Sequence, residues 1–149
     1  MTVNCSTTTG KKMYSSVQDV VDQSDPQIII QLTADDDTGA YDTALIEAKI
    51  READSIIDGY LRKTYSVPLP DPAPDLIKEA SVIITLYKLY QKREIEEMPE
   101  SVVEAYKDIR RRLEKLSDGT IILDVPDLNT YDSVQTIRTK DSILNLGKY

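Results

Sequence analysis

The sequence predicts a mainly α-helical protein: a compact bundle of three long helices plus two short N-terminal helices, with an extended C-terminal tail. Three observations predict this fold class. Apolar residues recur at helical spacing in the stretches 42–64, 75–94 and 99–117. Breaks that contain proline or glycine lie between these stretches and after the last of them. The last thirty residues have little apolar content. A chain of 149 residues suits one domain with a modest core.

The sequence of the N-terminal region predicts a flexible arm over 1–12, followed by two short helices. Ser16, with Asp19 three residues later, approximates a capping box that starts the first helix. Asp25 followed by Pro26 starts the second, because proline at the first helical position loses no hydrogen bond. Both helices are too short to be stable alone, so we expect them to dock on larger elements.

An aspartate-rich loop over 33–42 leads into the first long helix, with Asp42 as the expected N-cap. The loop does not match the ligand spacing of a calcium-binding EF-hand, because the acids and the glycine fall at the wrong positions. A looser cation site on Asp35, Asp37 and Asp42 stays open, and with it a metal-dependent enzyme as one hypothesis.

Three residues inside the first long helix call for interpretation. Asp54 and Asp58 lie one helical turn apart, and we interpret them as part of a solvated face beside Arg51 and Arg62 rather than as an acid/base pair. Gly59 interrupts the helical pattern at a cost of about 1 kcal/mol against alanine. We therefore expect a close helix approach or a local bend at Gly59.

The second long helix, over 75–94, follows a stiff connector with four prolines between 68 and 74. From Ala80 to Tyr90, eight of the eleven residues are apolar or tyrosine, which predicts burial on more than one side. The β-branched run at 82–85 leaves a strand as the alternative.

The third long helix, over 99–117, has a narrow apolar seam, and Gly119 is its expected C-cap. The helical domain thus covers 13–118. The extended tail over 119–149 contains short β-prone segments, and we expect it to be mobile alone or ordered by a partner.

Composition excludes several classes of function. The chain has no His and one Cys, which removes imidazole catalysis, intrachain disulfides and Cys-cluster metal sites. The formal net charge is -8, and the excess comes from residues 13–42, which carry seven Asp and no base. Arg110, Arg111 and Arg112 point about 100° apart on a helix, so they form no single basic stripe. No run is apolar enough to span a bilayer. We expect no cofactor, no resident metal, no membrane association and no enzymatic activity.

Two stretches, 13–39 and 55–90, resemble small proteins of Mu-type prophages. Members of that family begin with Met-Tyr and a short helix, continue with an Asp-rich loop, and share two further motifs. The matching residues are Ile57, Asp58, Gly59, Tyr60, Leu61, Tyr65, Pro68, Leu69, Tyr87, Leu89 and Tyr90. The resemblance covers about 13–118 and so leaves most of the tail outside it.

The resemblance implies a structural role similar to that of tailed-phage head–tail connector, or adaptor, proteins. Such a subunit assembles as a cyclic homo-oligomer, a ring between portal and tail. Its partners would be the portal protein and a tail or head-completion protein, with genomic DNA passing through without sequence-specific binding. The location would be the virion neck, after assembly in the host bacterial cytoplasm. The alternative is a small helical DNA-associated or regulatory phage protein.

We also predict which residues such a connector would use. The expected interface includes the outer face of the second long helix, the proline connector and part of the tail. The individual residues are Tyr87, Tyr90, Val134, Ile137, Ile143, Leu144 and Leu146. Three consecutive acids, Asp35, Asp36 and Asp37, are expected to face the DNA channel, where like charges repel DNA.

Overall fold

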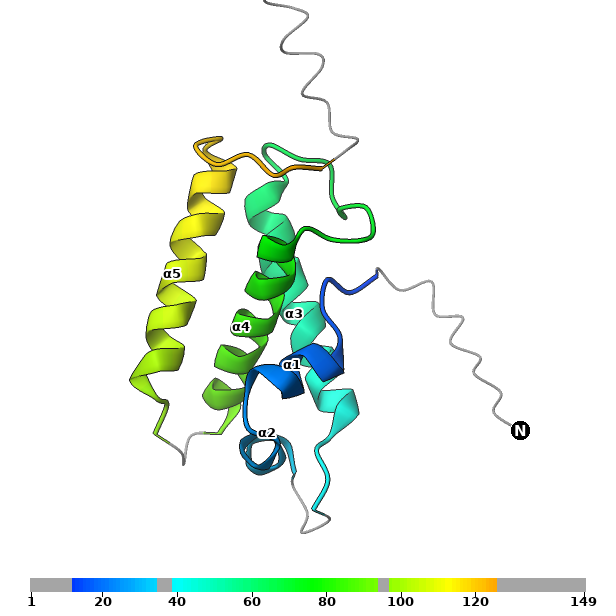
Figure 1. Ribbon diagram of the computed structural model, residues 1–149, viewed down its shortest axis with the longest axis vertical. Coiled ribbons are helices and arrows are strands. Elements are labelled where there is room, and N and C mark those ends of the chain that lie inside the picture. Colours follow the sequence, from blue (N-terminus) through cyan, green and yellow to red (C-terminus); the bar gives the residue numbers. More distant parts are fainter. Residues whose placement is uncertain (1–11, 35–38, 94–96, 126–149) are drawn as a thin grey trace, which may run out of the picture.

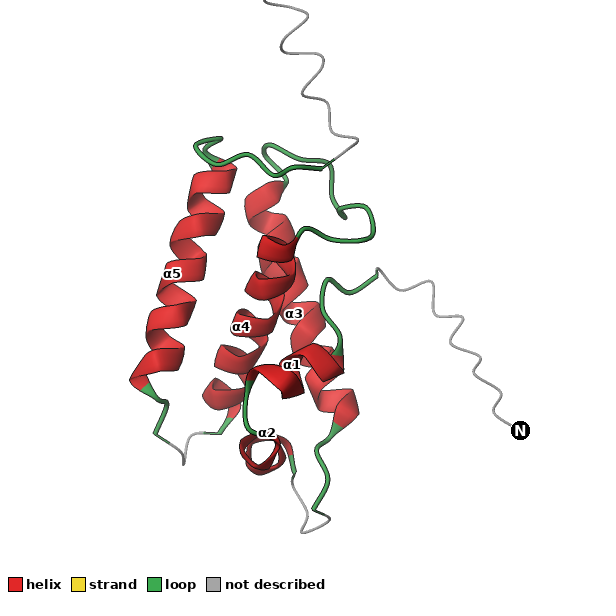
Figure 2. Cartoon of the chain, in the orientation of Figure 1, coloured by secondary structure: helices red, strands yellow, loops and turns green. Residues whose placement is uncertain are grey.

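A computed structural model describes residues 12–34, 39–93 and 97–125, and these residues form five helices and no strand (Figures 1 and 2). The helices are α1 (Val17–Gln23), α2 (Pro26–Thr33), α3 (Thr43–Leu61), α4 (Asp75–Lys92) and α5 (Glu100–Ser117). The prediction of a mainly α fold with three long and two short helices is confirmed. In the described ranges, no helix is long and apolar enough to cross a membrane.

The three long helices lie side by side, and α4 contacts all four other helices (Figure 1). Residues on nearly every side of α4 are buried, including Ile77, Val82, Thr85 and Leu89. The strand alternative for 82–85 is therefore wrong, because a helix there buries β-branched side chains against several neighbours at once. This burial arises within one chain, since all the neighbours of α4 named here belong to the same subunit.

Helices α1, α2 and α3 begin where a side chain accepts one of their first N–H groups, whereas α4 and α5 begin after Pro74 and Pro99 without a side-chain cap. Ser16 and Asp19 form the predicted capping box: the Asp19 N–H donates to Ser16 Oγ (3.2 Å), and the Ser16 N–H donates to Asp19 Oδ2 (2.8 Å). The carboxylates of Asp25 and Asp42 accept backbone N–H groups in the first turns of α2 and α3. The three predicted N-caps are confirmed.

The two short helices dock on α3 and α4 as expected. Ile29 and Leu32 of α2 are at most 1% exposed, and they share a core cluster with Ile46 of α3 and Leu89 of α4. A second cluster joins the other halves of α3 and α4 to α5. An ion pair between Lys78 and Asp19 (3.0 Å) also links α4 to α1.

Gly59 differs from its prediction. A Cβ atom added there would meet no atom within 4 Å, and α3 continues through the residue to Leu61. The expected close approach of another helix is wrong, because Gly59 lies on the exposed face of α3.

The chain after α5 turns back onto the bundle. Gly119 has φ +77°, a conformation that favours glycine and agrees with its predicted role as C-cap. The β-prone stretch 120–125 forms no strand, since none of the described segments offers it a strand to pair with. Leu123 packs into the core instead, so this part of the tail is ordered by its own chain. The rest of the predicted tail and residues 1–11 lie outside the described residues.

Candidate functional site

The most polar part of the interior is built around Tyr14, just before α1. Its side chain lies against α3, where Asp54 and Asp58 are one turn apart on the inward face. These carboxylates are 2% and 7% exposed. The interpretation of Asp54 and Asp58 as a solvated face is therefore wrong.

Tyr14 bonds both carboxylates. Its backbone N–H donates to Asp54 Oδ2 (2.9 Å), and its hydroxyl donates to Asp58 Oδ1 (2.5 Å). The same hydroxyl accepts the backbone N–H of Leu69 (3.0 Å) from the proline connector. Burial, together with the hydrogen bond to Asp58, raises the pKa of the Tyr14 phenol, because both oppose its ionisation.

A serine pair extends these contacts to α4. Ser81 Oγ donates to Asp54 Oδ1 (2.6 Å) and lies 2.8 Å from Ser15 Oγ. One polar cluster, hereafter the Tyr14 cluster (Tyr14, Ser15, Asp54, Asp58 and Ser81), thus joins the N-terminal segment, α3 and α4, and reaches the connector through Leu69. Throughout the described part of the chain, every buried side-chain nitrogen or oxygen has a hydrogen-bond partner.

The chemistry of this cluster is that of a structural tie. Donors from the chain itself occupy both Asp54 oxygens and one Asp58 oxygen. No group of three or more His, Cys, Asp or Glu residues in 12–34, 39–93 or 97–125 is placed to hold a metal ion. Asp35 and Asp37 of the looser cation site lie outside these ranges. The arrangement can therefore fix the relative positions of four segments.

The residues of the family motif surround the same region. Ile57, Leu61, Tyr65 and Leu69 are buried in one core cluster, and Asp58 belongs to the Tyr14 cluster. The hydroxyl of Tyr65 also accepts the backbone N–H of Leu123 (2.9 Å), the contact that anchors the chain after α5. Two motif residues, Gly59 and Pro68, are exposed, and Tyr60 is half-buried. Most of the motif thus serves the interior.

The two described residues of the predicted interface lie on α4. Tyr87 stacks on Tyr106 of α5, with ring centroids 3.9 Å apart and planes 5° from parallel. Tyr90 is 7% exposed, so another protein that binds the subunit in this conformation would contact little of the Tyr90 side chain. Their role in an interface stays a prediction. The remaining interface residues, Val134, Ile137, Ile143, Leu144 and Leu146, and the acids Asp35, Asp36 and Asp37 lie outside the described residues.

The arginines of α5 do not act as one group. Arg110 pairs with Glu114 (3.4 Å), and the Tyr60 hydroxyl raises the pKa of its guanidinium. Arg112 pairs with Asp108 (3.2 Å) and also with an acid of α4. These contacts agree with the prediction that the three arginines form no single basic stripe.

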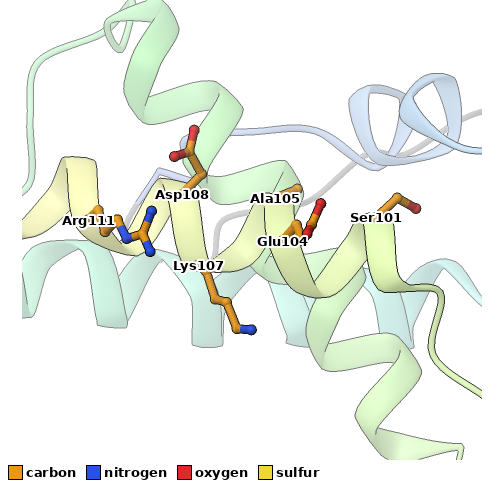
Figure 3. A pocket seen from close by; sticks show the side chains of 6 residues that line it. All are labelled: Ser101, Glu104, Ala105, Lys107, Asp108 and Arg111. Carbon is orange, nitrogen blue, oxygen red and sulfur yellow. The ribbon is translucent and has the colours of Figure 1, made fainter.

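A surface pocket of about 580 Å³ runs along the outside of α5 (Figure 3). Its lining residues all come from this helix: Ser101, Glu104, Ala105, Lys107, Asp108 and Arg111. Lys107 and Arg111 make no ion pair with any described residue, whereas Arg110 and Arg112 do. Our sequence reasoning missed this surface, hereafter the α5 face. The alternation of acids and bases on one side of the helix is the signal that could have indicated it.

Comparison with known proteins identifies a family. A family model described as Bacteriophage Mu, Gp36 matches residues 14–138. The match begins at Tyr14 and therefore includes the Tyr14 cluster, all five helices and the segment that returns to the bundle. No curated protein matches the chain.

Proposed function

The chain belongs to the Bacteriophage Mu, Gp36 family, and from that membership we propose that it is a head–tail connector subunit. In this role it assembles as a ring between portal and tail, in the neck of the virion. Its partners are further copies of itself, the portal protein and a tail or head-completion protein. It performs no chemical reaction, and genomic DNA passes through the ring without sequence-specific binding.

The observation that carries the proposal is the use of the motif residues. The Tyr14 hydroxyl bonds two motif residues in the interior: it donates to Asp58 and accepts the N–H of Leu69, which holds separate segments in register. A buried carboxylate whose donors come from its own chain supports rigidity rather than turnover. A rigid helical body suits a subunit that transmits contacts between neighbours.

The α5 face is the described surface best suited to a neighbouring subunit. A ring needs head-to-tail contacts, in which each subunit presents two different surfaces. The α5 face is hollowed and carries Glu104 and Asp108 beside Lys107 and Arg111, so it can select a partner by charge pattern. The ion pairs of Arg110 and Arg112 keep those two side chains within the bundle's own network.

The test is a measurement of mass by analytical ultracentrifugation, with the protein alone and mixed with its portal protein, followed by electron microscopy of any assemblies. The proposal expects rings or a stable portal complex. A monomer that stays monomeric in the presence of the portal protein would overturn the connector role. Salt-dependent DNA binding that Arg110–Arg112→Ala weakens would support the DNA-associated alternative instead.

A charge-reversal pair tests the α5 face separately. Lys107→Glu with Arg111→Glu should weaken assembly at least about tenfold, which corresponds to 1.4 kcal/mol. The matched control is Arg62→Glu with Lys63→Glu, which makes the same charge change at exposed positions after α3. Equal effects of the two double variants would remove the α5 face from the proposal and leave the connector role standing.

A further inference from the structure

One end of the bundle carries an apolar groove that the proposed function does not use. The groove has a volume of about 690 Å³ and lies between the proline connector, Pro70–Leu76, and the returning segment, Ile121–Val125. Ile122 lines it and is 69% exposed, the one large apolar side chain of the described residues with such exposure. The groove therefore offers the exposed side chain of Ile122 and the prolines of the connector to another segment.

We propose that this groove, hereafter the connector groove, is covered in the free subunit by residues 134–149 of the same chain. The first argument is the position at which the described chain ends. Val125 lines the groove, and only the eight residues 126–133 separate it from the proposed occupant. Eight residues of chain have a root-mean-square span of about 16 Å, so the proposed occupant is within reach of the groove.

The short linker also favours the chain's own segment over that of another copy. A tether of this length gives an effective concentration of about millimolar at the groove. A second copy at a micromolar concentration is therefore outcompeted, unless an assembly holds it in place. The linker includes Pro126, Asp127 and Asn129, residue types that readily reverse the direction of a chain.

The charges of the groove and its proposed occupant are complementary. The lining residues include Asp71, Asp75 and Asp124 and no base, although Asp71 also pairs with Lys12. Residues 134–149 carry three bases against one acid, a side-chain charge of +2. The bases are Arg138, Lys140 and Lys148, and the acid is Asp141.

The apolar content is complementary as well. The occupant contains five aliphatic residues that can replace water over Ile122 and the prolines, namely Val134, Ile137, Ile143, Leu144 and Leu146. Docking then hides the apolar surface of a subunit that has not assembled. This inference stands whether or not the protein is a connector, because it concerns the isolated chain.

Paramagnetic broadening in NMR spectra tests the proposal on the full chain. A nitroxide is attached at Ser142→Cys in a Cys5→Ser background, and a second sample carries it at Thr139→Cys. Both positions are polar, so the label replaces no proposed apolar contact. We expect loss of most of the amide signal intensity at Leu76, Ile122 and Leu123, and unchanged signals at the far end of α5.

Three results would overturn the proposal. Full signal intensity at the groove with both labels would show that the segment does not dock there. Broadening in a mixture of ¹⁵N-labelled protein without nitroxide and unlabelled protein with nitroxide would assign the occupant to a second copy. The variant Ile122→Asp should abolish the broadening and Ile122→Leu should retain it, with unchanged circular dichroism for both. Broadening that survives Ile122→Asp would also count against docking in the groove.

Discussion

Replacing Tyr14 with phenylalanine tests the structural role of the Tyr14 cluster most directly. The substitution keeps the buried ring and removes only the hydroxyl. That hydroxyl donates to Asp58 at 2.5 Å and accepts from the Leu69 N–H at 3.0 Å. Each buried partner left unsatisfied costs about 1–3 kcal/mol. With two partners, we expect Tyr14→Phe to lower the free energy of unfolding by about 2–6 kcal/mol in total.

Urea unfolding followed by circular dichroism measures this loss, as a lower midpoint at an unchanged dependence on denaturant. In thermal unfolding the same loss corresponds to a decrease in Tm of about 10 °C. Tyr41→Phe is the control for loss of a tyrosine hydroxyl, because Tyr41 packs against the core as a partly buried residue and its hydroxyl bonds to no described residue. If both variants unfold at the same urea concentration, the cluster is not the tie that its geometry indicates.

Three further predictions concern Tyr14 and two residues of α3, Asp54 and Gly59. The raised pKa of Tyr14 means that the folded state keeps this proton where the unfolded chain ionises, above about pH 10. Its contribution is complete below that pH and lost as the pH rises, so urea midpoints of the wild type should fall more steeply above pH 10 than those of Tyr14→Phe. Asp54→Asn should lower the free energy of unfolding by about 2 kcal/mol or more, because an amide has one acceptor oxygen for two donors. Calorimetry measures this loss, and an unchanged unfolding transition would contradict the reasoning. Gly59→Ala should stabilise the isolated chain by about 0.5–1 kcal/mol in urea unfolding; a loss of stability would mean that the space around Gly59 is not open.

The helix boundaries could be predicted because their causes are local. Ser16, Asp25 and Asp42 cap helices through N–H groups within three residues of each, so the sequence pattern contains both partners of every hydrogen bond. The amphipathic spacing of the long helices is local as well, because it depends only on residues three and four positions apart. The helix over 82–85 was harder to predict, because β-branched residues suit a strand and only the surrounding helices decide between the two.

The polar cluster could not be predicted in this way. Asp54 and Asp58 have Arg51 and Arg62 near them in sequence, which favours a solvated face. Their actual donors include Tyr14, forty residues or more before them, and Ser81, twenty-seven after Asp54. No spacing rule connects residues at such separations. The same holds for Leu123, whose N–H finds the hydroxyl of Tyr65 fifty-eight residues earlier.

The sequence by itself determined the mainly α class, the number of helices, their caps and the resemblance to Mu-type phage proteins. These features depend on periodicity and on contacts between residues close in sequence, and both are visible in the sequence of one chain. Only the tertiary structure decided that α4 is covered by its own chain, that two acids are buried and that a groove opens beside Ile122. Each of these depends on which distant segments meet, because the environment of a side chain is set by the residues folded around it.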